Sequence, residues 1–113
     1  SRVRYPGLPG DPGHALASRQ MEGFGTLVTF DLAAGLEAGT QFAESLALFS
    51  ITASLGSTES LVVAPAMQQP RGFTTEQALW TDIGPGTVRL SIGIEDPEDL
   101  VADLGQALDR LAA

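Results

Sequence analysis

The sequence has no cysteine and no lysine, and its 113 residues include one histidine. Without cysteine the chain can form no disulfide and offers no thiolate as a ligand or nucleophile. Without lysine it has no side-chain amine for a Schiff base, because all six basic residues are arginines. The histidine, His14, stands in a glycine- and proline-rich segment and is poor evidence for a metal site or a general base. We interpret it as structural.

Basic residues and long apolar runs are scarce as well. Six arginines stand against 14 acids, and the net charge of −8 argues against nucleic acid or an anionic membrane as a partner. No apolar run approaches the roughly 18 residues of a spanning helix, and no signal-peptide pattern occurs, so no membrane span or anchor is expected. The absence of cysteine fits a cytoplasmic protein. P-loop, GxGxxG, GxSxG and HExxH motifs are also missing. The residues that are present, 43% hydrophobic and 18% charged, are typical of one folded domain.

The stretch 87–99, TVRLSIGIEDPED, predicts a strand that leads into a helix. Every second residue is apolar, which gives the strand one wholly apolar face (Val88, Leu90, Ile92 and Ile94). Asp96 is placed as the N-cap and Pro97 as the first helical residue. On the other face the small residues Ser91 and Gly93 should leave open space beside Arg89, a plausible seat for a small anion. A surface salt bridge made by an edge-strand arginine is the competing explanation.

The remaining periodicities predict an alternation of helices and strands. Residues 1–13 read as an extended connector and residues 14–113 as a single domain. Helices are expected at 14–21, 34–49, 76–82 and from Pro97 onward, and strands at 24–32 and 50–55. Thr74 or Thr75 is the expected cap of the third helix, 59–63 a short helix or edge segment, and 65–73 a surface loop. This order favours an α/β fold with a small sheet and helices laid on one side.

Two further groups of polar residues are ambiguous. Residues 54–60, SLGSTES, could bind an anion through hydroxyl and backbone N–H groups, or simply form a turn and a helix cap. Five acids lie close together near the last helix (Glu95, Asp96, Glu98, Asp99 and Asp103). They lack EF-hand spacing, and a helix N-terminus explains acids at this place.

Five segments, in this order and spacing, resemble a known family: YPGL (5–8), RQMEGFGTLVTF (19–30), SLGSTESL (54–61), the proline-methionine loop (65–67) and VRLSIGIEDPEDLVADLGQAL (88–108). Together they are similar to the C-terminal domain of the pyridoxal-phosphate (PLP) enzymes of cysteine and methionine metabolism. That family includes cystathionine synthases and lyases, O-acylhomoserine sulfhydrylases and methionine γ-lyases. The resemblance implies a small mixed, mostly antiparallel sheet with helices on one side, as in fold-type I enzymes.

The resemblance also implies that this chain is part of a larger enzyme. In the family an N-terminal domain carries the cofactor-binding lysine, and the full enzyme is a homotetramer. We therefore expect the isolated chain to bind no PLP and to be inactive.

The family pattern assigns roles to two residues. The arginine of its RLS motif, which grips the substrate's α-carboxylate, matches Arg89, and the assisting serine of its SLG motif matches Ser54. The implied reaction is γ-replacement or γ-elimination on homoserine esters or sulfur amino acids. Ala53 and the run 67–70 depart from the cystathionine-handling branches and favour a sulfhydrylase or γ-lyase. The alternative is a free-standing α/β domain that binds an amino acid as a regulatory sensor.

Overall fold

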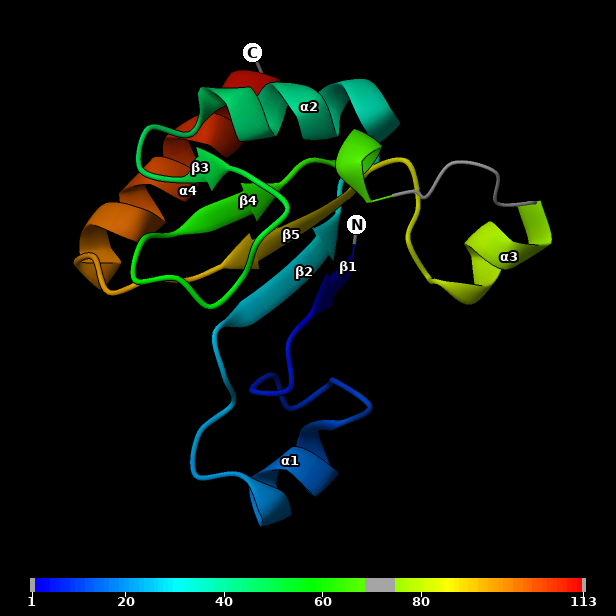
Figure 1. Cartoon of the computed structure of the whole chain (residues 1–113), viewed down its shortest axis with the longest axis vertical. Coiled ribbons are helices and arrows are strands. Elements are labelled where there is room, and N and C mark those ends of the chain that lie inside the picture. Colours follow the sequence, from blue (N-terminus) through cyan, green and yellow to red (C-terminus); the bar gives the residue numbers. More distant parts are fainter. Residues whose placement is uncertain (1, 69–74, 113) are drawn as a thin grey trace.

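The computed structural model describes residues 2–68 and 75–112. Its centre is a five-stranded sheet with the order β1-β2-β5-β4-β3 (Figure 1). The strands are β1 (Arg2–Arg4), β2 (Leu27–Asp31), β3 (Ser50–Ile51), β4 (Leu61–Val63) and β5 (Thr87–Ser91). Three of the pairings are antiparallel and β3 with β4 is parallel. The expected mixed, mostly antiparallel sheet is confirmed.

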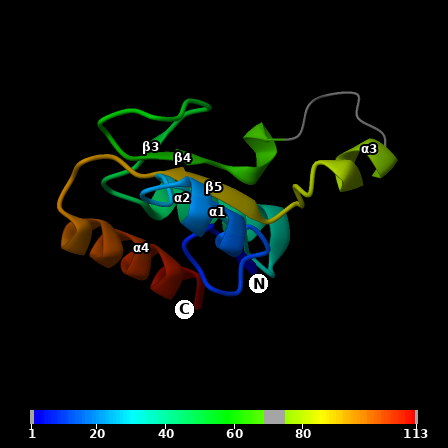
Figure 2. The same ribbon diagram turned by 90° about the horizontal axis from the view of Figure 1, so that it is seen from below.

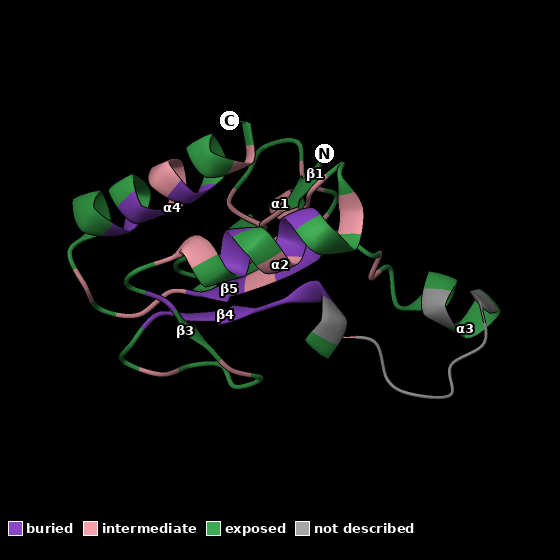
Figure 3. Cartoon of the chain, turned by 90° about the horizontal axis from the view of Figure 1, so that it is seen from above, coloured by how far each residue is buried: buried purple, intermediate pink, exposed green. Residues whose placement is uncertain are grey.

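Two helices cover one face of the sheet, α2 (Gly35–Ser45) and α4 (Pro97–Ala112). The core lies between them and the strands, where buried residues gather in Figure 3. It contains Phe42 and Ala43 from α2, Leu100 and Ala107 from α4, and Val62, Val88 and Leu90 from the strands. The segment after β3 lies on the other side of the sheet, away from α4 (Figure 2). The helices therefore leave the opposite face of β5 available for polar residues.

The other helical elements lie outside this two-layer core. Helix α1 (His14–Gln20) lies beyond one end of β2, and α3 (Thr75–Trp80) projects to the side of the sheet (Figure 1). A short 3₁₀ turn, η1 (Pro65–Met67), follows β4. Of the described helices, none has the length and apolar character needed to cross a membrane.

Helix α4 begins where the sequence predicts. Pro97 is its first residue, and the Asp96 carboxylate accepts a hydrogen bond of 2.8 Å from the backbone N–H of Glu98. Helix α2 is shorter than the predicted 34–49, because the buried Asp103 of α4 accepts the backbone N–H groups of Ala47 and Leu48. Those two groups are consequently not available to continue the helix.

Two predictions about the strands are wrong. Residues 59–63 form neither a helix nor an edge, because Leu61–Val63 is paired on both sides and all three residues are buried. Residues 2–4, expected within the connector, are strand β1 of the sheet. The strands expected at 24–32, 50–55 and 88–94 are present but shorter, and helix α1 ends one residue early. The proposed cap Thr74 and residues 69–73 of the predicted loop lie outside the described residues.

Candidate functional site

Arg89 lies on β5, the central strand, and its side chain is on the face opposite the core residues Val88 and Leu90. Its partners in register are Thr29 on β2 and Val63 on β4. One terminal guanidinium nitrogen, Nη2, donates a hydrogen bond of 3.3 Å to the backbone carbonyl of Ser54. The structure therefore brings the two predicted site residues together, with the Ser54 backbone as the point of contact.

The arrangement does not support the competing explanation of an edge-strand salt bridge. Arg89 is half-buried on an interior strand, and no carboxylate of the described residues lies within 4.0 Å of it. Its Nε atom is buried without a hydrogen-bond partner in the described part of the chain. Because an arginine stays charged at any physiological pH, this guanidinium carries a positive charge that its described neighbours do not neutralise.

The open space expected above Ser91 and Gly93 is absent. The segment 52–60, here called the β3–β4 loop, covers both residues: the N–H of Gly56 donates to the Ser91 hydroxyl at 2.9 Å, and the N–H of Ile94 donates to the carbonyl of Thr58 at 2.9 Å. A Cβ on Gly93 would collide with the backbone of Thr58 and Glu59. The small side chains thus admit the protein's own loop, and the prediction of open space above them is wrong.

Ser60 and Glu95 hold the far end of the same loop. The hydroxyl of the fully buried Ser60 donates to Glu95 Oε1 at 2.8 Å and accepts the N–H of Gly93 at 2.9 Å. The Ser60 backbone N–H donates to Glu95 Oε2 at 2.9 Å. These bonds, led by the Ser60 backbone N–H, lower the pKa of Glu95 below its ordinary value. Sequence reasoning treated Glu95 as a helix-terminal acid and missed this contact.

The other candidates from the sequence have structural partners. The ring of His14 contacts the Pro6 carbonyl through Nδ1 at 2.7 Å and stacks on Phe24, which agrees with a structural role. The acids near α4 are dispersed, since Asp96 caps the helix, Asp103 binds Ala47 and Leu48, and Glu95 binds Ser60. Residues 2–68 and 75–112 contain no group of three His, Cys, Asp or Glu that could hold a metal ion.

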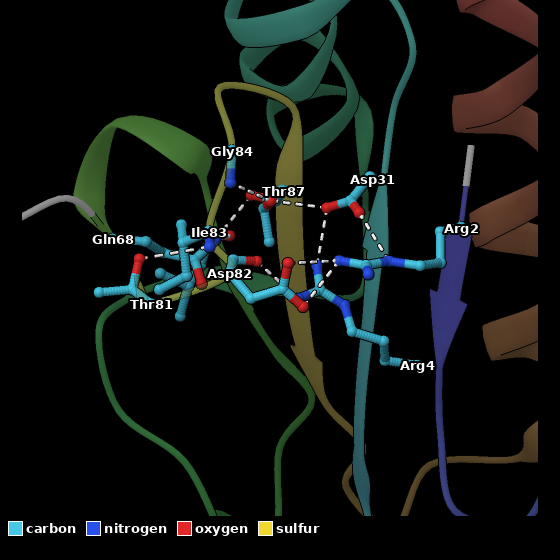
Figure 4. A network of polar contacts seen from close by, with 10 residues as sticks. Arg2, Arg4, Asp31, Gln68, Thr81, Asp82, Ile83, Gly84 and Thr87 are labelled. Atoms are coloured by element: carbon cyan, nitrogen blue, oxygen red, sulfur yellow. Dashed lines mark hydrogen bonds and ion pairs between the residues drawn. The ribbon is translucent and has the colours of Figure 1, made fainter. Parts of the chain in front are cut away.

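A second polar cluster ties β1 to the turn after α3, as Figure 4 shows. Arg2 Nη2 lies 2.8 Å from both carboxylate oxygens of Asp82, and Arg4 bonds Asp31 at 2.7 Å and the Asp82 carbonyl at 2.7 Å. The Thr87 hydroxyl donates to Asp31 at 2.6 Å. These two arginines are paired with acids, whereas Arg89 has no acidic partner among the described residues.

Comparison with known proteins identifies the family. A family model described as "Cys/Met metabolism PLP-dependent enzyme" matches residues 1–109. The chain belongs to this family. An L-methionine γ-lyase of Fusobacterium nucleatum subsp. polymorphum is 44% identical over 110 residues, which are 97% of this chain and 28% of that protein. A cystathionine γ-lyase of Dictyostelium discoideum is 40% identical over 109 residues, covering 96% of this chain and 28% of the relative.

A solved structure confirms the fold as well. The crystal structure of metB from Corynebacterium glutamicum is 42% identical in sequence and superposes with a TM-score of 0.82, over 98% of this chain and 28% of that one. The chain therefore spans little more than a quarter of the length of the relatives it matches. The sequence of this part contains no lysine.

Proposed function

We propose that this chain is the C-terminal, substrate-binding part of a PLP-dependent enzyme that performs γ-elimination or γ-replacement on sulfur amino acids or homoserine esters. In this proposal Arg89 binds the α-carboxylate of the amino-acid substrate and Ser54 assists. The observation that carries the proposal is the half-buried guanidinium of Arg89, which sits on the central strand without an acidic partner among the described residues.

A carboxylate is the ligand that best suits this arrangement. The planar guanidinium can donate two parallel hydrogen bonds to a carboxylate, and charge-assisted bonds of this kind are about twice as strong as neutral ones. The Ser54 carbonyl already holds Nη2, so the guanidinium is oriented before the substrate arrives. The Ser54 hydroxyl has no hydrogen-bond partner within residues 2–68 and 75–112, and it is free to add a further bond to the substrate.

The cofactor is proposed to attach elsewhere in a longer enzyme. PLP supplies the electron sink for the reaction when it is bound. The residues described here would orient the substrate by its carboxylate, and the isolated chain would be inactive. The lack of lysine and the 28% coverage of the relatives both support this division of labour. Such an enzyme is proposed to be cytoplasmic.

An apolar cavity supports the proposed contact with the rest of the enzyme. It has a volume of about 340 Å³ and lies between β1, β2 and α4, with Val3, Val28, Phe30, Leu104 and Leu108 among its lining residues. Val3 and Leu108 are about half exposed. Apolar surface of this kind is usually covered in the functional protein. We propose that the cofactor-binding domain of the same enzyme covers it, within a homotetramer.

Ala53 also narrows the proposal to particular branches of the family. It favours a γ-lyase or a sulfhydrylase over an enzyme that handles cystathionine. The relatives named above include both a methionine and a cystathionine γ-lyase, so they do not separate these branches. The run 67–70 favours the same branches of the family. Two of its residues, Gln69 and Pro70, lie outside the described residues.

Kinetics of the full-length enzyme test the role of Arg89. Arg89→Ala should raise KM for the amino-acid substrate strongly, because it removes one partner of a charge-assisted pair. The expected loss of binding free energy is about 2–5 kcal/mol. Arg110→Ala makes the same change of charge at the exposed end of α4 and should leave KM unchanged. If Arg89→Ala leaves KM as it was, the substrate carboxylate is bound elsewhere.

The alternative of a regulatory amino-acid sensor would share the same anion site. The two proposals differ in what the gene encodes upstream of Ser1. A cofactor domain with a lysine supports the enzyme, whereas an unrelated domain or a stop codon supports the sensor. The family match over residues 1–109 favours the enzyme.

A further inference from the structure

We propose that Ser91, Ser60 and Glu95 are positioning residues that set the direction of the Arg89 guanidinium by fixing the β3–β4 loop against β5. This inference rests on the proposed role of Arg89 in carboxylate binding and extends it to residues that do not touch the substrate. It gives a functional role to the hydrogen bonds of Ser91 and Glu95. The sequence pattern alone does not reveal these bonds.

The loop and the strand meet at regularly spaced positions. Counting in twos from Arg89 gives Ser91, Gly93 and Glu95, and each of the four contacts the loop. On the loop the bonded positions are Ser54, Gly56, Thr58 and Ser60, again two residues apart, and the carbonyl of Thr58 accepts the N–H of Ile94. The loop is therefore attached along its length, and Ser54 with Arg89 forms one end of this row.

Ser91 is the attachment nearest to the proposed clamp. Its side chain is almost completely buried, and its hydroxyl accepts the N–H of Gly56, two residues from the Ser54 carbonyl that holds Arg89. Gly56 has a φ of +76°, a backbone conformation that glycine adopts without strain. Without the Ser91 hydroxyl this turn loses its bond to β5, so the Ser54 carbonyl is no longer held over Arg89.

Ser60 and Glu95 attach the other end of the row. The Glu95 carboxylate accepts both the N–H and the hydroxyl of Ser60, and the same hydroxyl accepts the N–H of Gly93. Ser60 is fully buried, so the loss of Glu95 would leave two donors without their acceptor. Glu95 therefore maintains the position from which the loop reaches back toward Arg89.

A positioning role predicts a specific loss that general destabilisation would not produce. A misdirected Arg89 should weaken binding of the substrate's carboxylate and leave the rest of the substrate unaffected. The measurement is the KM of the full-length enzyme for an amino-acid substrate and for its α-carboxamide, which lacks the negative charge. The ratio of the two values reports the carboxylate interaction alone.

We expect Ser91→Ala to raise KM for the acid about three- to tenfold, as for the loss of one hydrogen bond, with kcat and the KM for the amide nearly unchanged. Glu95→Ala should act in the same direction, and Glu95→Gln, which keeps an acceptor for Ser60, should be milder. Ser18→Ala makes the same chemical change as Ser91→Ala on α1, where the hydroxyl bonds only its own helix, and should alter neither KM.

The variants separate this inference from the proposed function. If Arg89→Ala leaves the ratio unchanged, the proposed carboxylate clamp fails, and the positioning role fails with it. If Arg89→Ala raises KM for the acid relative to KM for the amide but Ser91→Ala and Glu95→Gln do not, only the positioning role is overturned. An equal rise in KM for acid and amide would show a merely structural effect and would also overturn it. If Ser91→Ala does not fold, the two KM values of Glu95→Gln decide whether the positioning role holds.

Discussion

At the scale of single residues, the small side chains beside Arg89 serve packing. Ser91 and Gly93 suggest an opening when the sequence is read as a strand with one polar face. In the structure the β3–β4 loop fills that opening, and Gly93 has no room for a side chain. A small residue next to a charged one thus indicates a close approach of backbone as readily as a ligand site.

Replacing Gly93 tests this close approach. Gly93→Ala should lower the free energy of unfolding by about 1–3 kcal/mol, because its Cβ would meet the backbone of Thr58 and Glu59, which cannot rotate away. Gly105→Ala on α4 is the matched control, since a Cβ there meets nothing within 4 Å. Alanine favours the helix, so this control should raise stability by about 0.5–1 kcal/mol. Urea unfolding measures both, and equal effects of the two variants would contradict the packing argument.

The residues of the candidate site differ in how far the sequence reveals them. Arg89 and Ser54 follow from the family motifs, and the structure places them in contact. Ser91, Ser60 and Glu95 could not be recognised in this way, because their bonds join positions 35 residues apart. A contact of that kind depends on how the strands pair, and no local pattern in the sequence records it.

At the scale of the elements, local signals predict some boundaries and distant contacts decide the others. Helix α4 carries its own start signal in Asp96 and Pro97, and the sequence alone predicts its start. The end of α2 depends on Asp103, whose carboxylate accepts the backbone N–H of Ala47. The two residues are 56 positions apart in the sequence. The central position of β4 likewise depends on its pairing with β5 and β3. The stripe of apolar residues in 34–49 therefore predicts a helix that is too long.

The ion pairs between β1 and the turn after α3 should make the attachment of these elements depend on pH. The hydrogen bond from Arg2 is the main reason that the pKa of Asp82 lies below its ordinary value. A carboxylate with a lowered pKa contributes stability that is present above its unfolded pKa and is lost as the pH falls through the folded value. The contribution should therefore be complete at pH 7, begin to fall near pH 4, and be lost only as the pH drops below the lowered pKa of the folded protein.

Asp82→Asn tests this pH dependence. Asparagine tolerates the positive φ of 55° at this position, so the variant removes the charge and leaves the backbone conformation accessible. The variant should be less stable than the wild type at pH 7, and the difference should be smaller at pH 3. Urea unfolding at both values measures it, with the exposed Asp109→Asn on α4 as a control that should change little. A difference as large at pH 3 as at pH 7 would show that the charge is not responsible.

At the scale of the whole molecule, the sheet is covered unevenly on its helical face. Helices α2 and α4 cover the core residues of β4 and β5, whereas the cavity of about 340 Å³ leaves apolar groups of β1 and β2 accessible. The half-exposed Val3 and Leu108 line this cavity. The domain thus combines a polar face, which holds the proposed clamp, with an apolar area on the opposite side of the sheet that is suited to contact with the rest of an enzyme.

The accessibility of that cavity provides a test of the proposed partner domain. The isolated chain should bind the dye ANS with enhanced fluorescence, because apolar area of this kind is exposed to solvent. Val3→Ser should reduce the signal, whereas Val101→Ser, which removes a similar side chain from the exposed face of α4, should not. In the full-length enzyme the partner domain should cover the cavity, and the fluorescence per mole of this domain should fall several-fold. If the dye signal were the same in both forms, or if it did not respond to Val3→Ser, the cavity would not be the surface on which the rest of the enzyme packs.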